Sequence, residues 1–380
     1  MDASSPELMP LSGVTVLDFS SLVPGPLATL LLAAAGAAVT KVENPAGGDA
    51  LRARPGSFGL LNAGKAAIAA DLKSPDQVAR LEPLLRSCDV LVEQFRPGVM
   101  DRLGLGYDAV RAVNPRVIYC SITGYGQSGP RRGRAGHDLN YLGHSGALEL
   151  VRHDGVPGSA LPPALLADVG AGSYPAVINI LLALLKRERT GHGCHLDIAI
   201  ANNIFPFIFW ALAEAGSDPL APGAGRLAGG SPRYQTFRTS DGRTALVAPL
   251  EQKFWNAFCE VIGLDEQLRD DAGDPQATIA AVAAIIESRP SSYWSAVFEE
   301  ADCCCSIAAT VEEAMTDPAF RARGLFTAAS GLPHPGPAAL PLPLDRSLAR
   351  TLTDPAPDLL PAPPDGTASG RESLTSCPLL

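Results

Sequence analysis

The sequence predicts an α/β protein, with a doubly wound, Rossmann-like parallel sheet in a large domain and a smaller α+β domain after it. Short β-branched runs alternate with helical stretches through the first 200 residues. The 380 residues are 46% hydrophobic and 18% charged, enough to bury two cores. A Gly/Pro-rich segment at 220–230 interrupts the alternation. We therefore expect a large domain at 1–224, to which a Pro-rich 331–380 returns before a loose tail, and a small domain at 225–330.

The first elements predict the sheet type. Residues 13–19 form a β-branched run typical of a buried strand. Pro24 and Pro26 suit the first turn of a helix that continues through 27–35. Residues 38–43 repeat the strand pattern. A strand, a helix and a strand within about 30 residues form a βαβ unit, so the strands are expected to run parallel with a right-handed crossover.

The alternation continues along the chain, and then the pattern changes. After the linker, two short runs flank an Asp-Gly turn, which predicts a β-hairpin. Further strands are expected at 66–71, 90–93, 117–122 and 194–199, the hairpin at 234–239 and 244–248, and helices at 75–87, 108–113, 174–187, 204–215, 254–262, 279–287 and 293–301. No Gly-x-Gly-x-x-Gly follows the first strand, so the fold alone does not imply a nicotinamide cofactor.

Composition excludes several classes of function. A net charge of −10 argues against a nucleic-acid partner, which needs a basic surface. Eight cysteines, three of them consecutive at 303–305, lack the spacing of a metal site and suggest reduced thiols. No basic segment precedes an apolar one at the N-terminus, and two prolines cut the apolar stretch 19–40. We expect a cytoplasmic protein without a metal or a membrane partner.

Two side chains of complementary proton chemistry lie in the segment 134–172. They are His137 and Asp168, and the Gly/Ser/Pro-rich passage between them has the composition of a loop that can bring them together. A lone His is more often structural, and a lone Asp here can be a helix N-cap. The start of the helix would also offer free amide groups to an oxyanion, and Gly170 and Gly172 would admit a ligand. The pattern favours an acid/base pair that faces a substrate carbon.

Cationic side chains recur on loops that follow predicted strands, among them a cluster of Arg131, Arg132 and Arg134. Each one alone is more often a solvated surface charge, but several on the carboxyl edge of one acidic protein favour a phosphorylated ligand. The candidate ligand-binding cations are Arg52, Lys65, Arg96, Arg132 and Arg134.

Several motifs occur together between residues 11 and 330. They include Leu17-Asp18-Phe19, Lys41-Val42-Glu43-Asn44-Pro45, Phe95-Arg96-Pro97-Gly98, Thr123-Gly124-Tyr125-Gly126-Gln127-Ser128-Gly129-Pro130 and Gly229-Gly230-Ser231-Pro232-Arg233-Tyr234. With them the chain resembles the class III CoA-transferase family. The resemblance implies an interlocked homodimer, coenzyme A bound by the large domain, and no cofactor beyond the coenzyme A of the substrate thioester.

Within that family the chain is most similar to the racemases of 2-methyl-branched acyl-CoA. The matching residues are His137, Asp138, Asp168 and, in a Leu-Glu-x-x-Phe motif, Glu251. The resemblance implies 1,1-proton transfer through an enolate, with His137 and Asp168 on opposite faces of the α-carbon and Asp138 and Glu251 orienting the imidazole. A 2-aryl acyl group would suit the same chemistry. The alternative is a CoA transferase in which Asp168 forms an acyl anhydride.

Two positions depart from the family pattern. Asn44 stands where many relatives place an Arg that contacts the nucleotide, and His144 is an additional histidine for which a structural role is expected. The aromatic-rich stretch 204–210 suits either an acyl pocket or, more commonly, a packed core helix.

Overall fold

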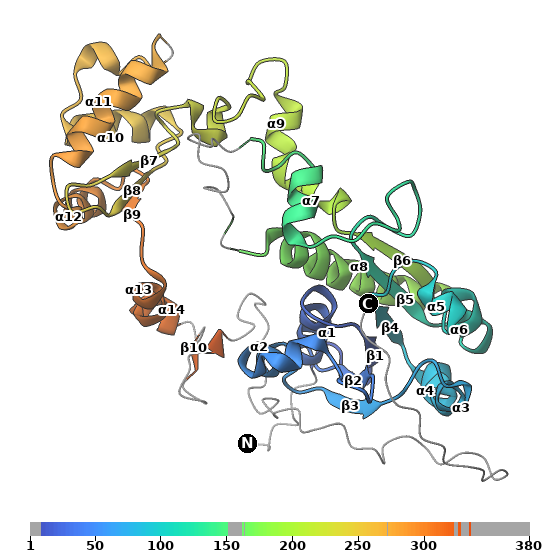
Figure 1. The fold of residues 1–380 in the computed structure, drawn as a ribbon. Helices are drawn as coiled ribbons and strands as arrows, with labels where there is room; N and C mark the ends of the chain where they lie inside the picture. The colour runs from blue at the N-terminus through green and yellow to red at the C-terminus, as the bar shows by residue number, and fades with distance from the viewer. Residues whose placement is uncertain are drawn as a thin grey trace.

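The computed structural model describes residues 9–150, 162, 164–271 and 273–322, and two short strands, β10 (Phe326–Thr327) and β11 (His334–Pro335). The expected return of 331–380 to the large domain and its loose tail lie outside the described residues, apart from β11. Figure 1 shows the arrangement of the elements.

A six-stranded parallel sheet forms the centre of the larger region. Its order is β3-β2-β1-β4-β5-β6, which is the strand order of a doubly wound α/β sheet. The chain reverses direction across the sheet between β1 and β4, where such sheets open a crevice at their carboxyl ends. The parallel α/β prediction is confirmed. The strands are β1 (Thr15–Phe19), β2 (Ala38–Glu43), β3 (Ala66–Ala69), β4 (Val90–Glu93), β5 (Ile118–Thr123) and β6 (Cys194–Ala199).

Helices cover both faces of this sheet. Because side chains alternate along a strand, neighbours on β1 enter different cores: Val16 packs with helices α1 (Pro24–Ala34) and α8 (Tyr174–Thr190), and Leu17 packs with α4 (Glu82–Ser87) and α6 (Tyr107–Val113). The helix expected at 75–87 is two helices, since α3 (Pro75–Arg80) ends before Pro83 in the first turn of α4.

Helix α8 continues a π-helix, η2 (Leu166–Ser173), so that one apolar helix runs for 25 residues. Its length and hydropathy would suffice to span a membrane. However, Ala176 and Ile180 are buried in the core, and the buried Arg187 pairs with Asp89 at 2.9 Å. One face of this helix therefore packs into the core of the larger region.

A second region has its own antiparallel sheet and its own core. The predicted hairpin is present as β7 (Gln235–Arg238) and β8 (Thr244–Val247), and an unpredicted strand, β9 (Cys305–Ile307), pairs with β8. Trp255, Phe258, Trp294 and Phe298 fill the core under helices α10 (Gln252–Ile262), α11 (Pro275–Glu287) and α12 (Ser291–Ala301). Figure 1 shows these elements apart from the six-stranded sheet. The domain boundary at residue 224 stays a prediction.

The stretch expected as a helix at 204–215 forms two elements. They are a 3₁₀-helix, η3 (Asn202–Ile208), which contains Pro206, and the short helix α9 (Phe209–Ala213). The remaining elements of the described chain are η1 (Ala50–Ala53), α2 (Pro55–Leu61), α5 (Val99–Arg102), α7 (Asp138–His144), η4 (Arg226–Gly230), η5 (Glu266–Leu268), α13 (Val311–Thr316) and α14 (Pro318–Ala322).

Candidate active site

The carboxylate of Asp138 joins two elements at the carboxyl edge of the sheet. Asp138 is the first residue of α7, and its side chain is buried. Its Oδ1 atom accepts hydrogen bonds from the backbone N–H groups of Ala167 and Asp168, each with an N···O distance of 2.8 Å. An anionic acceptor at the start of a helix satisfies amide groups that have no partner within the helix. Asp138 therefore fastens α7 to the start of η2.

This arrangement corrects two expectations about the site. We expected free amides at the start of the helix to stabilise an enolate, but the first four N–H groups all have acceptors. Those of Leu166 and Val169 donate to Ala164 and Leu165 carbonyls at 3.0 Å, and the other two donate to Asp138. We also expected Asp138 to orient the imidazole of His137, whereas its hydrogen bonds in the described chain hold the backbone around Asp168.

The glycines of η2 have packing partners instead of an open ligand face. A Cβ atom on Gly170 would lie 3.0 Å from the ring of Phe207, and one on Gly172 would lie 3.3 Å from the ring of Pro24. These glycines let η2 approach its neighbours closely. We expected Gly170 and Gly172 to admit a ligand, and this expectation is wrong, because the two glycines admit neighbouring side chains instead.

Asp168 is a carboxyl group in an unfavourable environment for its charge. Burial is the main cause, and the nearby Asp138 carboxylate adds repulsion, whereas His137 acts in the opposite direction. Together they raise the pKa of Asp168 to about 6. Asp168 lies in the π-helix η2, a type of element that is frequent at functional sites. A half-buried carboxyl with this pKa can both accept and donate a proton near neutral pH.

His137 lies beside this carboxyl at the N-cap of α7. Its backbone N–H donates to Oδ1 of Asn140 at 3.0 Å, and its side chain is exposed. It is close enough to Asp168 to counteract the rise in the pKa of that carboxyl. The structure therefore brings the adjacent residues His137 and Asp138 together with Asp168, which follows Asp138 by 30 residues.

Glu251 is not part of this group within one chain. It is an exposed residue that immediately precedes α10. Helix α10 belongs to the region of the second sheet, which Figure 1 shows apart from α7. The pKa of the Cys304 thiol is raised, mainly by desolvation of the thiol and next by the negative charge of Glu251.

The candidate cations divide into engaged and available groups. Lys65 is fully buried, and its Nζ atom donates to Asp18 (3.1 Å), the carbonyl of Pro26 (2.8 Å) and Asn62 (2.9 Å). Its place among ligand-binding residues is therefore corrected, because no face of the ammonium is open. Arg52 is 24% exposed and pairs with Glu43 at 2.7 Å, so its charge is already balanced.

The other three cations lie on open loops. Arg96 follows β4, and Arg132 and Arg134 follow β5; all three are exposed. The carboxyl ends of β4 and β5 are adjacent in the sheet, so these loops leave the same edge. Asn44, in the turn after β2, accepts a hydrogen bond from the N–H of Ala46 at 2.9 Å.

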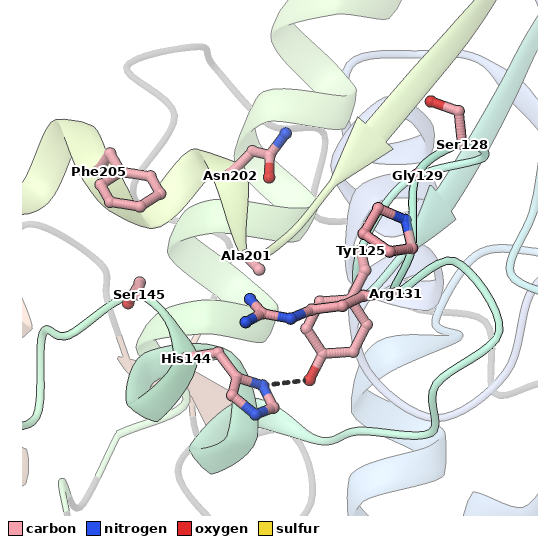
Figure 2. A pocket seen from close by; sticks show the side chains of 10 residues that line it. Tyr125, Ser128, Gly129, Arg131, His144, Ser145, Ala201, Asn202 and Phe205 are labelled. Carbon is pink, nitrogen blue, oxygen red and sulfur yellow. Dashed lines mark hydrogen bonds between the residues drawn. The ribbon is translucent and has the colours of Figure 1, made fainter.

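A cavity of about 380 Å³ opens beside the C-terminal end of α7, and the sequence did not predict it. Figure 2 shows the side chains that line it, among them Tyr125, Arg131, His144 and Phe205. The hydroxyl of Tyr125 and Nδ1 of His144 share a hydrogen bond of 2.7 Å. His144 is exposed, and its structural role stays a prediction. The sequence signal for this cavity was the spacing of seven residues between His137 and His144, which places both side chains on the same face of a helix.

Comparisons with known proteins assign the family. The sequence profile of CoA-transferase family III matches residues 11–364. The chain is 33% identical over 356 residues to alpha-methylacyl-CoA racemase of Homo sapiens, covering 90% of each chain, and 30% identical over 345 residues to acetyl-CoA:oxalate CoA-transferase of Acetobacter aceti, covering 86% and 88%.

A solved structure agrees with this assignment. The crystal structure of a CAIB/BAIF family protein from Brucella suis aligns with a TM-score of 0.75 and 28% sequence identity, covering 92% of this chain and 97% of that chain. From its motifs, its fold and its relatives, the chain belongs to CoA-transferase family III.

Proposed function

We propose that this enzyme racemises 2-methyl-branched or 2-aryl acyl-CoA thioesters. The observation that carries the proposal is the pairing of His137 with Asp168, a carboxyl whose pKa of about 6 lets it exchange a proton near neutral pH. The similarity to alpha-methylacyl-CoA racemases over 90% of the chain supports the same reaction.

The proposed chemistry needs one proton carrier on each side of the substrate's α-carbon. The thioester carbonyl acidifies the α C–H bond, one of the two groups removes that proton, and an enolate forms. The other group then donates its own proton to the opposite face, so the product differs from the substrate only in configuration. General acid/base catalysis of this kind contributes about 10²–10⁴-fold. Because the amides at 166–169 are occupied, the enolate oxygen needs donors other than these.

The exposed arginines Arg96, Arg132 and Arg134 are proposed to bind the phosphates of coenzyme A. Guanidinium groups suit phosphate because they donate in a planar fork. The acyl-CoA thioester would be the only source of coenzyme A, and no further cofactor enters the reaction. We place the enzyme in the cytoplasm.

A second copy of the chain is proposed as the partner that completes the site. Glu251 lies apart from His137 within one chain, so its predicted role requires a second chain. Exposed apolar side chains on two parts of the chain also need a cover of this kind. They are Ile178, Leu181, Leu182 and Leu185 on α8, and Phe207, Phe209 and Leu212 on η3 and α9.

Charge at that apolar surface tests the dimer. Leu182 and Leu185 are 59% and 63% exposed, so Leu182→Glu with Leu185→Glu costs little in a monomer and much in a dimer. We expect the double variant to elute as a monomer by light scattering and to lose activity. A wild-type protein that is monomeric at working concentration contradicts the dimer.

Solvent deuterium tests the racemase. Incubated in D₂O with either enantiomer of a 2-methylacyl-CoA and no acceptor acid, the enzyme should place deuterium at the α-position. His137→Ala should lose this exchange for the enantiomer whose α-proton faces the imidazole, whereas His192→Ala, which changes an exposed histidine in the turn after α8, should keep it for both. Exchange of both enantiomers at the wild-type rate in His137→Ala would show that the imidazole carries no proton.

CoA transfer through an Asp168 acyl anhydride is the second candidate. The carboxyl is half-buried in the same place, and relatives such as acetyl-CoA:oxalate CoA-transferase are named for CoA transfer. A transferase requires an acceptor acid and yields an acyl-enzyme that hydroxylamine traps. Trapping with acceptor-dependent turnover, and no α-exchange without an acceptor, would favour this candidate over the racemase.

A further inference from the structure

The cavity at the end of α7 contains polar groups that the proposed proton transfer does not use. Tyr125 and Arg131 come from the loop after β5, His144 from the last turn of α7, and Asn202 and Phe205 from η3. Figure 2 shows these side chains converging from three elements, with the guanidinium of Arg131 on the same side as the imidazole of His144. Such a convergence of polar groups over an open cavity is typical of a ligand subsite.

The charge of this cavity is positive and not balanced. No carboxylate in the described part of the chain pairs with Arg131, and no acidic residue lines the cavity. When the Tyr125 hydroxyl donates to Nδ1 of His144, a neutral imidazole carries its proton on Nε2 and can donate it to a ligand. One guanidinium and this one imidazole N–H form a site for a single anionic group.

Part of the cavity lining is apolar, and the rest is polar. Pro130, Ala201 and Phe205 form the apolar part, and Phe205 is 44% exposed. A carboxylate on a hydrocarbon chain suits one guanidinium fork beside such an apolar part, because the charge and the chain are both accommodated. The mixed lining therefore suits a carboxylate at the end of an aliphatic chain.

The helix places this cavity at a defined distance from the proton-transfer pair. His137, Asn140 and His144 are spaced by three and four residues, and all three are exposed, so they share one face of α7. At about 1.5 Å per residue, seven residues separate the two histidines by about 10 Å along the helix. A flexible acyl chain that starts at His137 can run along this face and end in the cavity.

We propose that the cavity formed by Tyr125, Arg131 and His144 binds a carboxylate at the far end of the acyl group, so that ω-carboxy acyl-CoA thioesters are preferred substrates. This inference rests on the proposed function, because it assigns the substrate class of the same site. A free dicarboxylic acid would supply the same chemistry, and the experiments separate these sources.

Matched thioesters provide the test. Pairs of 2-methylacyl-CoA substrates of increasing chain length, with and without a terminal carboxylate, are compared by KM for α-exchange and by Kd from calorimetry. For the chain that fits the spacing, we expect the carboxylate to lower Kd and KM about tenfold, as one charge-assisted hydrogen bond allows. Arg131→Gln should remove this preference, and Tyr125→Phe and His144→Leu should reduce it. Arg86→Gln, which changes an exposed arginine on α4, should leave the preference intact.

Each other outcome has a distinct meaning. An absent preference in the wild type, or an equal loss for both members of a pair in Arg131→Gln, overturns the carboxylate subsite. A loss that instead depends on the 3′-phosphate, seen with 3′-dephospho-CoA thioesters, also overturns it and assigns Arg131 to the nucleotide. Binding of free dicarboxylates with the same dependence on Arg131, and no preference among thioesters, identifies an acceptor acid in place of the acyl chain. Because Kd needs no turnover, missing α-exchange with a retained preference contradicts only the racemase.

Discussion

Two buried carboxylates at the carboxyl ends of this sheet have opposite electrostatic environments. Asp18, on β1, is fully buried, which by itself raises a carboxyl pKa, but the Nζ of Lys65 at 3.1 Å, the charge of Lys41, and hydroxyls of Ser20 and Thr29 outweigh burial. The pKa of Asp18 therefore lies well below its ordinary value. Asp168 has repulsion from Asp138 instead of an ammonium partner, and its pKa is raised to about 6.

The comparison separates structural charge from reactive charge. Asp18 and Lys65 satisfy each other in the interior, and the pair keeps the Asp18 carboxyl ionised at neutral pH. Asp168 has no such compensation, so its charge is costly to the fold and its proton is exchangeable at neutral pH. Groups of this second kind concentrate at functional sites.

Asp168→Asn should have the largest effect and should act on activity and stability in opposite directions. We expect α-exchange to fall by at least about 10²–10⁴-fold, because a proton carrier is lost. Above pH 6 the folded protein bears the cost of an ionised Asp168, and this cost disappears as the pH falls toward the ordinary pKa of 3.8. The variant should therefore raise the free energy of unfolding by about 1–2 kcal/mol at pH 7.5, and by less at pH 4.5. Urea denaturation at both pH values measures this, and a loss of stability at pH 7.5 would contradict the assigned cost.

Lys65→Met should have the next largest effect, on stability alone. It leaves the Asp18 carboxylate buried without its closest counter-charge, and breaking one side of a buried pair costs about 3–5 kcal/mol. Urea denaturation measures the loss, with the exposed Lys73→Met as the control. Adding Asp18→Asn should recover part of the loss. If Lys65→Met behaves like Lys73→Met, the ion pair makes no difference to folding.

Asp138→Ala should have an intermediate effect that sharpens the role of this carboxylate. It removes the acceptor for the buried N–H of Ala167 and the N–H of Asp168, and unsatisfied buried groups cost about 1–3 kcal/mol each. Asp138→Asn retains a carbonyl oxygen and should lose clearly less. Equal losses in the two variants, measured by urea denaturation, would mean that hydrogen bonding does not set the stability of this junction.

Asp138→Asn should also have the smallest effect, on the pH profile. Removing the negative charge lowers the pKa of Asp168 from about 6, so the acidic limb of kcat/KM for α-exchange should move to lower pH by less than about one pH unit. The profiles of both enantiomers measure this shift. An acidic limb that moves to higher pH would show that Asp138 stabilises, and does not oppose, the charge on its neighbour.

The sheet could be predicted because its signals are local. The strands expected at 38–43, 90–93 and 194–199 end at the residues where the structure ends them. The first two are rich in buried β-branched residues, and the third, at the edge of the sheet, alternates between exposed and partly buried residues before its buried end. Helix α7 was missed, because Asp138, Asn140 and Gly143 have weak helix propensity and the helix depends on contacts with η2.

Contacts between distant residues explain what could not be predicted at the site. His137 and Asp168 were found, but the occupied amides of η2 follow from a carboxylate 30 residues earlier. Lys65 resembles a surface cation in sequence, and its burial depends on Asp18, which is 47 residues away. The cavity around His144 arises where three separate elements meet. Spacing along the chain carries none of this information.

The Asp138 bridge has a consequence for how the family can diversify. Because one carboxylate ties the backbone of η2 to the first turn of α7, the proposed proton carriers His137 and Asp168 are held together before the proposed thioester binds. Larger or smaller acyl groups must then be accommodated by the surrounding walls, such as η3 and the loop after β5. The residues of η3 and of that loop can therefore vary without changing the distance between His137 and Asp168.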